Sequence, residues 1–184
     1  KSYPNTPVAI SEYGSGASIK HHDRNISKAP KAGGKWHPEE WQSRSHEILW
    51  DKIASRETTW GTFLWNMFDF AADARDQGGE PGMNHKGLVT FDRQTKKDSF
   101  YLYKAYWNAE PMIHICSKRF VDRKKNRITV KVYSNQPSLQ FYCNGELVAT
   151  KEADHVFTCK IDLKDGENEI RVVAGDLEDT ATFV

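Results

Sequence analysis

The stretch Pro7-Val8-Ala9-Ile10-Ser11-Glu12-Tyr13-Gly14 decides the interpretation of the first part of the chain. Its apolar run is short and ends in polar residues, which is typical of a strand covered on both faces in a parallel sheet. A second apolar run, residues 62–68, has the same character. Because parallel neighbours are joined by a crossover that is usually helical, we expect a helix between the two runs.

Residue chemistry supports that helix. Pro38 suits a first helical position, and Glu39 and Glu40 suit the first turn. The helix is expected to reach about Glu57, with an apolar face made of Ile48, Leu49 and Ile53.

A long loop is expected over residues 71–94, followed by a second helix. Thr95 and Asp98 have the spacing of a capping box, which would open that helix. Its apolar face would consist of Phe100, Tyr103 and Trp107.

Strand, helix, strand, helix with parallel strands is a βαβα unit. Two such strands cannot close a sheet, so they need neighbours that this sequence does not contain. We therefore expect the last βαβα portion of a (β/α)₈ TIM barrel, an α/β fold, and an open doubly wound sheet is the alternative. The chain opens at Lys1 without a signal-like segment, which fits the cut edge of a longer protein.

Composition changes near residue 110. All six Trp lie before it, and residues 108–111 have the chemistry of a linker. Beyond it, short runs separated by turn signals predict an all-β, immunoglobulin-like β-sandwich, and Asn144-Gly145 is the strongest hairpin signal. The predicted strands are residues 113–120, 127–133, 139–143, 146–151, 156–163, 168–173 and 180–184. The predicted domains are therefore residues 1–109 and 110–184.

The overall composition excludes several classes of protein. The 184 residues carry a net charge of +1, so the protein has no overall electrostatic attraction for nucleic acid or a membrane surface. Aromatic residues make up 12% of the chain, which argues against disorder. No apolar run is long enough for a membrane span. Cys116, Cys143 and Cys159 are too scattered for a disulfide framework or a zinc site, so we interpret them as small buried hydrophobic residues. No metal or cofactor is expected.

Two candidate functional residues lie where the predicted parallel strands end. Glu12 ends the first strand and Trp65 lies at the end of the second. The carboxyl ends of barrel strands form the active site, where a carboxylate can act as nucleophile, acid, base or metal ligand. An indole at this position provides a flat wall for a sugar ring. The alternatives are that Glu12 caps the following loop and that Trp65 belongs to the barrel core. Asp69 could pair with Glu12 or form a salt bridge.

Two further candidates lie in the glycine-rich loop after the second strand. Asn84 and Lys86 place an amide and an ammonium close together, which could clamp an anionic group, although a loop lysine is more often simply solvated. His21-His22-Asp23 is interpreted as a surface segment rather than a metal site, and residues 122–125 as a solvated turn.

These motifs resemble a known family. The first 108 residues resemble the end of the catalytic barrel of glycoside hydrolase family 2, the β-galactosidase and β-glucuronidase family, at four ordered motifs: residues 7–14, 65–70, 84–93 and 96–101. Residues 132–135, together with Asn144-Gly145, are similar to the immunoglobulin-like domain that follows the barrel in many bacterial members.

The resemblance implies a retaining exo-β-glycosidase that acts on terminal β-linked sugars by double displacement. It implies that Glu12 is the nucleophile, that Trp65 lines the sugar subsite, and that Asn84 and Lys86 hold a sugar carboxylate as in β-glucuronidases. The same pair occurs in relatives named β-galactosidases, so the sugar stays open. The implied partners are a carbohydrate substrate and the preceding part of the parent chain, and a homo-oligomer is allowed.

One departure from the family pattern matters. No Asn-Glu pair, the family's general acid/base motif, precedes Glu12, and Asn168-Glu169 lies in the predicted sandwich. We therefore expect the acid/base upstream of this chain, and negligible turnover by these residues alone. The alternatives are a non-catalytic carbohydrate-binding or bracing module, and a barrel enzyme that uses Glu12 with a metal.

Overall fold

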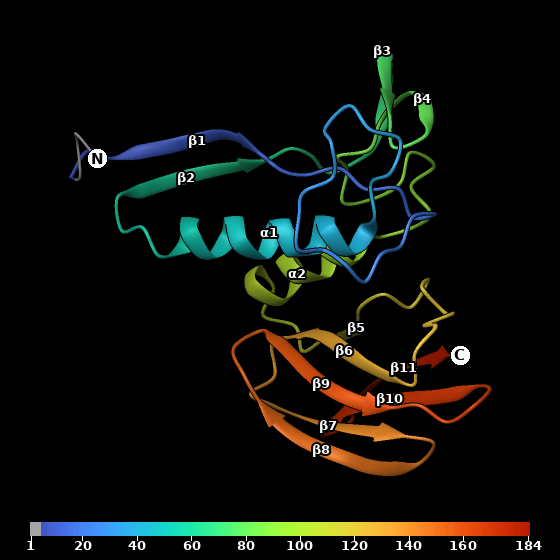
Figure 1. The fold of residues 1–184 in the computed structure, drawn as a ribbon. Helices are drawn as coiled ribbons and strands as arrows, with labels where there is room; N and C mark the ends of the chain where they lie inside the picture. The colour runs from blue at the N-terminus through green and yellow to red at the C-terminus, as the bar shows by residue number, and fades with distance from the viewer. Residues whose placement is uncertain (1–4) are drawn as a thin grey trace. The chain divides into compact units, whose positions relative to one another are not determined.

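The computed structural model describes residues 5–184, which form two compact units that divide between Phe100 and Tyr101 (Figure 1). Helix α2, Asp98–Trp107, straddles this division. The boundary predicted at residues 109 and 110 therefore stays a prediction. Among the described residues, no helix combines the length and apolar character needed to cross a membrane.

The first unit contains the predicted parallel strand–helix–strand arrangement. Strand β1, Val8–Tyr13, pairs in parallel with β2, Thr59–Leu64, and Tyr13 lies opposite Leu64 at the carboxyl ends. Helix α1, Glu39–Ala54, connects them and lies alongside the pair (Figure 1). The helix ends at Ala54 rather than at about Glu57, and β2 begins before the predicted residue 62.

Within the described residues, the two strands are not covered on both faces. Trp60 and Phe63 of β2 are 71% and 63% exposed. In the described part of the chain, β1 and β2 form a two-stranded sheet, so each keeps one edge without a partner strand. These strands thus carry apolar side chains that the first unit does not bury.

The buried face of α1 is polar, contrary to the apolar face predicted for it. Ile53 is buried, but Ile48 is 37% exposed. The other buried residues of the helix are Glu39, Gln42, Ser43 and His46. This face meets loops rather than apolar side chains: the Gln42 amide donates to the backbone carbonyls of Ser15 and Gly87.

The loop predicted over residues 71–94 contains an antiparallel hairpin. Strand β3, Phe70–Gln77, pairs with β4, Glu80–Asn84, through a Gly78-Gly79 turn (Figure 1). The strand signal is hidden in the sequence because β3 is rich in alanine and charged residues and is mostly exposed, so it lacks apolar alternation. The glycine pair was the available signal for a two-residue hairpin turn.

Helix α2 begins at Asp98, so Thr95 does not cap it as predicted. The Thr95 N–H instead donates to the Thr90 hydroxyl at 3.1 Å, within a small turn. The buried Glu39 side chain takes the capping role, because its Oε1 accepts the Asp98 N–H at 2.8 Å. Trp107, placed on the predicted apolar face, is 54% exposed.

The second unit contains the predicted β-sandwich. One sheet has the order β11-β10-β7-β8 and the other the order β5-β6-β9. Their bounds follow the predicted runs closely except for β5, which is short. The strands are β5 Ile113–Ile115, β6 Arg127–Ser134, β7 Ser138–Cys143, β8 Glu146–Glu152, β9 Val156–Asp162, β10 Asn168–Ala174 and β11 Leu177–Phe183.

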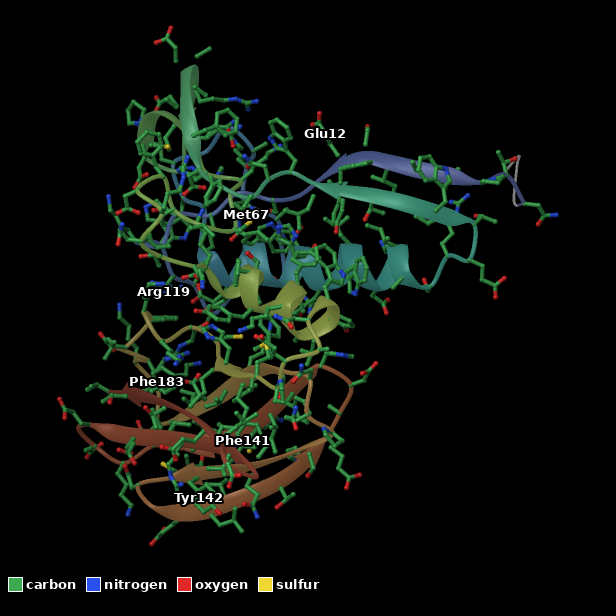
Figure 2. All side chains as sticks on the ribbon, turned by 180° about the vertical axis from the view of Figure 1, so that it is seen from behind. Glu12, Met67, Arg119, Phe141, Tyr142 and Phe183 are labelled. Carbon is green, nitrogen blue, oxygen red and sulfur yellow. The ribbon has the colours of Figure 1, made fainter. Side chains whose placement is uncertain are left out.

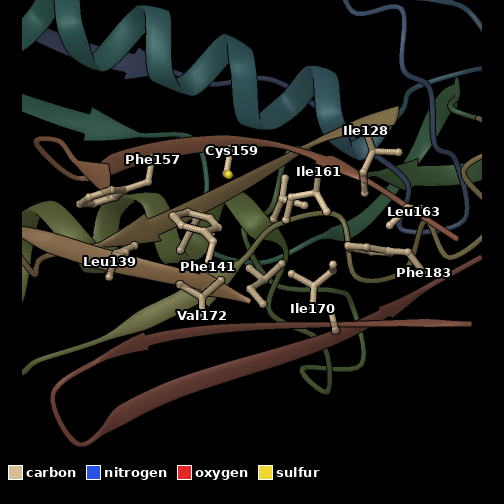
Figure 3. Packing of buried hydrophobic residues seen from close by; sticks show 14 residues of the cluster. Ile128, Leu139, Phe141, Phe157, Cys159, Ile161, Leu163, Ile170, Val172 and Phe183 are labelled. Atoms are coloured by element: carbon tan, nitrogen blue, oxygen red, sulfur yellow. The ribbon is translucent and has the colours of Figure 1, made fainter. Parts of the chain in front are cut away.

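The inward residues of both sheets form one apolar core (Figure 3). Phe141, Phe157 and Phe183 are its largest members and are almost wholly buried. Cys159 packs in the same core, and none of the three cysteines forms a disulfide. Burial raises the pKa of the Cys159 thiol, which fits the interpretation as a small hydrophobic residue.

Candidate active site

The ends of β1 and β2 bring Glu12 and Trp65 to adjacent positions. The Trp65 N–H donates to the Tyr13 carbonyl at 2.8 Å, so the residue after Glu12 is bonded directly to Trp65. Glu12 is exposed at the end of β1 (Figure 2), and Trp65 is 38% exposed and edge-on to Phe70. Neither side chain is sealed in a core, so both are available to a ligand.

A glycine makes this close approach of the two strand ends feasible. A Cβ atom at Gly14 would lie 2.1 Å from the Trp65 carbonyl oxygen, well inside van der Waals contact. Residue 14 must therefore lack a side chain for the loop after Glu12 to pass beside Trp65.

The residues that follow Trp65 pair with the segment that contains Lys86, so Lys86 lies next to the carboxyl end of β2. Residues 66–69 run parallel to residues 86–89, with a bridge between Phe68 and Val89. The Asn66 N–H donates to the Lys86 carbonyl at 3.3 Å. Two backbone hydrogen bonds thus join the three segments. Trp65 and Lys86 each take part in one of them, and Glu12 directly precedes Tyr13, the partner of Trp65.

Asn84 and Lys86 have different environments. Asn84 is buried, and its Oδ1 accepts the Lys86 N–H at 3.1 Å, which fixes the turn between them. The Lys86 side chain is half-buried, and its ammonium makes no hydrogen bond or ion pair with any residue that the structure describes. The lysine is therefore a cation without a protein counter-ion, on a backbone that is held in place.

A cleft of about 240 Å³ lies between the loop after Glu12 and Lys86. Two cationic side chains, Lys86 and Arg75, line it together with Trp41. The remaining lining residues are Gly14, Ser15, Gly16, Pro30, Ala32, His37, Gln77 and His85. The cleft thus offers positive charge and an indole, which suits a small anionic ligand with apolar faces.

Asp69 forms a buried ion pair, which removes it as a second carboxylate beside Glu12. Its Oδ1 lies 2.9 Å from the Lys97 ammonium, and the Lys97 side chain is fully buried. Burial raises the pKa of the Asp69 carboxyl and lowers the pKa of Lys97, and each partner opposes the shift of the other. This role of Lys97 was not predicted from the sequence.

The histidine segment also serves the structure. The His21 ring stacks on Trp36 at 4.3 Å and accepts the His37 N–H, and His22 contacts Glu40 at 2.9 Å. The Asp23 N–H donates to the same glutamate. These contacts tie the loop to the start of α1, so the segment is half-buried rather than the surface segment that was predicted.

Two buried histidines should make the free energy of unfolding depend on pH. Burial lowers the pKa of His46 and of His85 from 6.5 to about 4. The unfolded chain takes up these protons first, so stability is unchanged above pH 6.5, falls as the pH drops from 6.5 to 4, and levels off below that. Each histidine contributes up to about 3 kcal/mol. Thermal unfolding across this range should show a shallower slope for His46→Gln, and parallel curves would contradict the assignment.

Comparison with known proteins gives consistent results. No protein-family profile matches the chain. A β-glucuronidase of Bacteroides fragilis is 46% identical over 176 residues, which is 94% of this chain and 25% of that protein. A putative β-glucuronidase of Formosa agariphila is 33% identical over 132 residues, 66% of this chain and 16% of that protein.

Two solved structures share the fold over 99% of the chain. One, described as an FMN-binding β-glucuronidase from Facaelibacterium prausnitzii, has a TM-score of 0.90 at 41% identity, with 27% of that chain covered. The other, a putative β-galactosidase from Bacteroides fragilis, has a TM-score of 0.92 at 34% identity, with 28% covered. The chain thus spans about a quarter of the length of these relatives.

The shared fold and the relatives together place the chain among the glycoside hydrolases. More particularly, it belongs to the β-glucuronidase and β-galactosidase family, glycoside hydrolase family 2, which the sequence motifs indicated.

Proposed function

We propose that the chain is the C-terminal part of a retaining exo-β-glycosidase that prefers β-glucuronides. Glu12 is the nucleophile, Trp65 forms one wall of the sugar subsite, and Asn84 and Lys86 make up the site for the sugar carboxylate. A carbohydrate is the substrate, and the preceding part of the enzyme is the structural partner of the exposed strands.

The observation that carries this proposal is the pair of backbone hydrogen bonds across three neighbouring segments. One joins Tyr13 to Trp65 at 2.8 Å, and the other joins Asn66 to Lys86 at 3.3 Å. They bring the backbones next to Glu12, Trp65 and Lys86 to neighbouring positions, which supports a site formed by a carboxylate, an indole and an ammonium. A nucleophile, an apolar wall and an anion-binding group are what hydrolysis of an acidic sugar needs.

The parallel β1–β2 pair supports a TIM-barrel setting for this edge. Parallel sheets are normally covered on both faces, yet Trp60 and Phe63 are mostly exposed in the described unit. Further strands at the two unpaired edges would complete a barrel and cover these side chains. The catalytic edge would then be the carboxyl-terminal face, where barrel enzymes hold their active sites.

The mechanism has two displacements. The Glu12 carboxylate attacks the anomeric carbon while a carboxylic acid outside this chain protonates the departing glycosidic oxygen. The resulting glycosyl ester is cleaved by water, which the same outside carboxylate deprotonates, so Glu12 is released and the β configuration is restored. This course requires the two carboxyl groups to lie about 5–5.5 Å apart.

The preference for a glucuronide is supported by Lys86 and by the relatives named β-glucuronidases. Glucuronate carries a carboxylate where galactose carries a neutral hydroxymethyl group. An ammonium without a protein counter-ion can form an ion pair with the former, whereas the hydroxymethyl group offers it only a neutral acceptor.

Two measurements on the whole enzyme test the proposed function. Aryl β-glucuronide should be hydrolysed at least ten times more efficiently than aryl β-galactoside. A 2-fluoroglycoside, which stalls the covalent intermediate, should label Glu12, as peptide mass spectrometry will show. Label on another carboxylate would refute the nucleophile, and a galactoside preference would refute the sugar.

A further inference from the structure

We propose that the buried pair Lys97–Asp69 positions Lys86 for the substrate carboxylate, and so helps to select acidic sugars. This inference rests on the function proposed above, and it assigns to two buried residues an effect on specificity. Neither residue touches the substrate in this proposal, because both act through the backbone on either side of Lys86.

Lys97 holds the peptide group that precedes Lys86. Its ammonium donates to the carbonyl of His85 at 3.1 Å, to the carbonyl of Ala17 at 2.8 Å and to Asp69 Oδ1 at 2.9 Å. A charged lysine has three N–H donors, so all of them are used. The three acceptors around one nitrogen fix its position, and with it the position of the His85 carbonyl.

Asp69 holds the peptide group that follows Lys86. Its Oδ1 accepts the Gly87 N–H at 2.9 Å, so the carboxylate links Gly87 to Lys97. Gln42 adds a hydrogen bond to the Gly87 carbonyl at 3.2 Å. A Cβ at Gly87 would lie only 2.6 Å from Asp69 Oδ1 and 2.1 Å from the Asp69 nitrogen, so this contact depends on glycine.

Lys86 therefore combines a fixed backbone with a free side chain. Its own N–H and carbonyl are bonded to Asn84 and Asn66, and both adjoining peptide groups are held by the ion pair. Because no carboxylate in the described part of the chain neutralises the Lys86 ammonium, its charge is available to pair with an anionic ligand. The position of the Lys86 ammonium depends on the backbone that carries it. A misplacement of a binding group by about 1 Å can lower the rate by a factor of about 10².

The consequence is a selective effect on substrates. A neutral sugar makes no charged contact with Lys86, so displacement of the lysine should leave its hydrolysis nearly unchanged. A glucuronide should bind more weakly, which raises KM more than it lowers kcat. A pair that only stabilised the fold would affect both substrates alike.

The test compares Asp69→Asn and Lys97→Met in the whole enzyme, with aryl β-glucuronide and aryl β-galactoside as substrates. Asp69→Asn keeps the size of the side chain but removes the negative charge that binds the Lys97 ammonium, so the lysine should release the His85 carbonyl, and Lys97→Met removes that hydrogen bond directly. Retained hydrolysis of the galactoside shows that each variant is folded. We expect KM for the glucuronide to rise about tenfold and kcat/KM for the galactoside to change less than threefold. Glu40→Gln, at a mostly buried carboxylate that binds His22 and the Asp23 N–H, is the control and should show no selectivity change.

A double-mutant cycle with Lys86→Ala separates this proposal from the proposed function. Once Lys86 is gone, Asp69→Asn should cause no further selective loss. Equal losses on both substrates, or a selective loss that persists without Lys86, would overturn the positioning role while the function stands. If Lys86→Ala itself fails to distinguish the two substrates, the function proposed for Lys86 is wrong.

Discussion

Replacement of Glu12 by Gln should lower β-glycoside hydrolysis by the whole enzyme by about 10⁴-fold or more, the scale seen when a covalent nucleophile is removed. Glutamine keeps the size of the side chain but cannot form the glycosyl ester. Glu12 is exposed, so the substitution should leave the thermal unfolding midpoint unchanged. Steady-state rates with an aryl glycoside and a melting curve of the same sample check both expectations.

A chemical rescue distinguishes a nucleophile from a group that merely orients the substrate. In Glu12→Ala, azide can attack the anomeric carbon from the face that the carboxylate vacates, so rescued activity should give an α-glycosyl azide. Glu57→Gln is the matched control, because Glu57 is also exposed but precedes β2 at the opposite end of the strand pair. A rescued product of β configuration, or an equal loss in Glu57→Gln, would contradict the assignment.

Local signals predicted the elements whose residues follow a clear period. The sandwich strands alternate apolar and polar residues, and Ile128, Val130 and Val132 all point into the core as expected. Asn144-Gly145 joins β7 and β8 in the predicted hairpin. The hairpin of β3 and β4 escaped prediction because its strands are exposed and carry little apolar pattern.

The candidate site was only partly predictable, for a related reason. Glu12 and Trp65 could be identified because parallel strands bring their carboxyl ends to one edge, which is a rule of topology. Lys97 could not, because burial of a lysine depends on acceptors supplied by Ala17, His85 and Asp69, which are far apart in the sequence. Polar contacts on α1 were missed likewise, since its buried face binds loop carbonyls that no helical period reveals.

Replacement of Lys86 by Ala should reduce kcat/KM for an aryl β-glucuronide roughly 30- to 5000-fold, which corresponds to the ~2–5 kcal/mol cost of removing one partner of a desolvated charge pair. The loss follows because the sugar carboxylate would leave water without a cation to receive it. For the galactoside, whose hydroxymethyl group is neutral, the change should stay below about fivefold. The ratio of the two kcat/KM values, measured on one preparation, is the readout.

Two variants show whether the charge itself causes the effect. Lys86→Arg keeps the cation and should retain more glucuronide activity than the alanine variant, although the guanidinium has a different shape. Lys52→Ala, in the exposed last turn of α1, should change neither substrate. A parallel fall on both substrates in Lys86→Ala would mean that the lysine supports the loop rather than the ligand. Because the backbone of this residue is already bonded on both sides while its ammonium has no described protein partner, the structure favours the selective result.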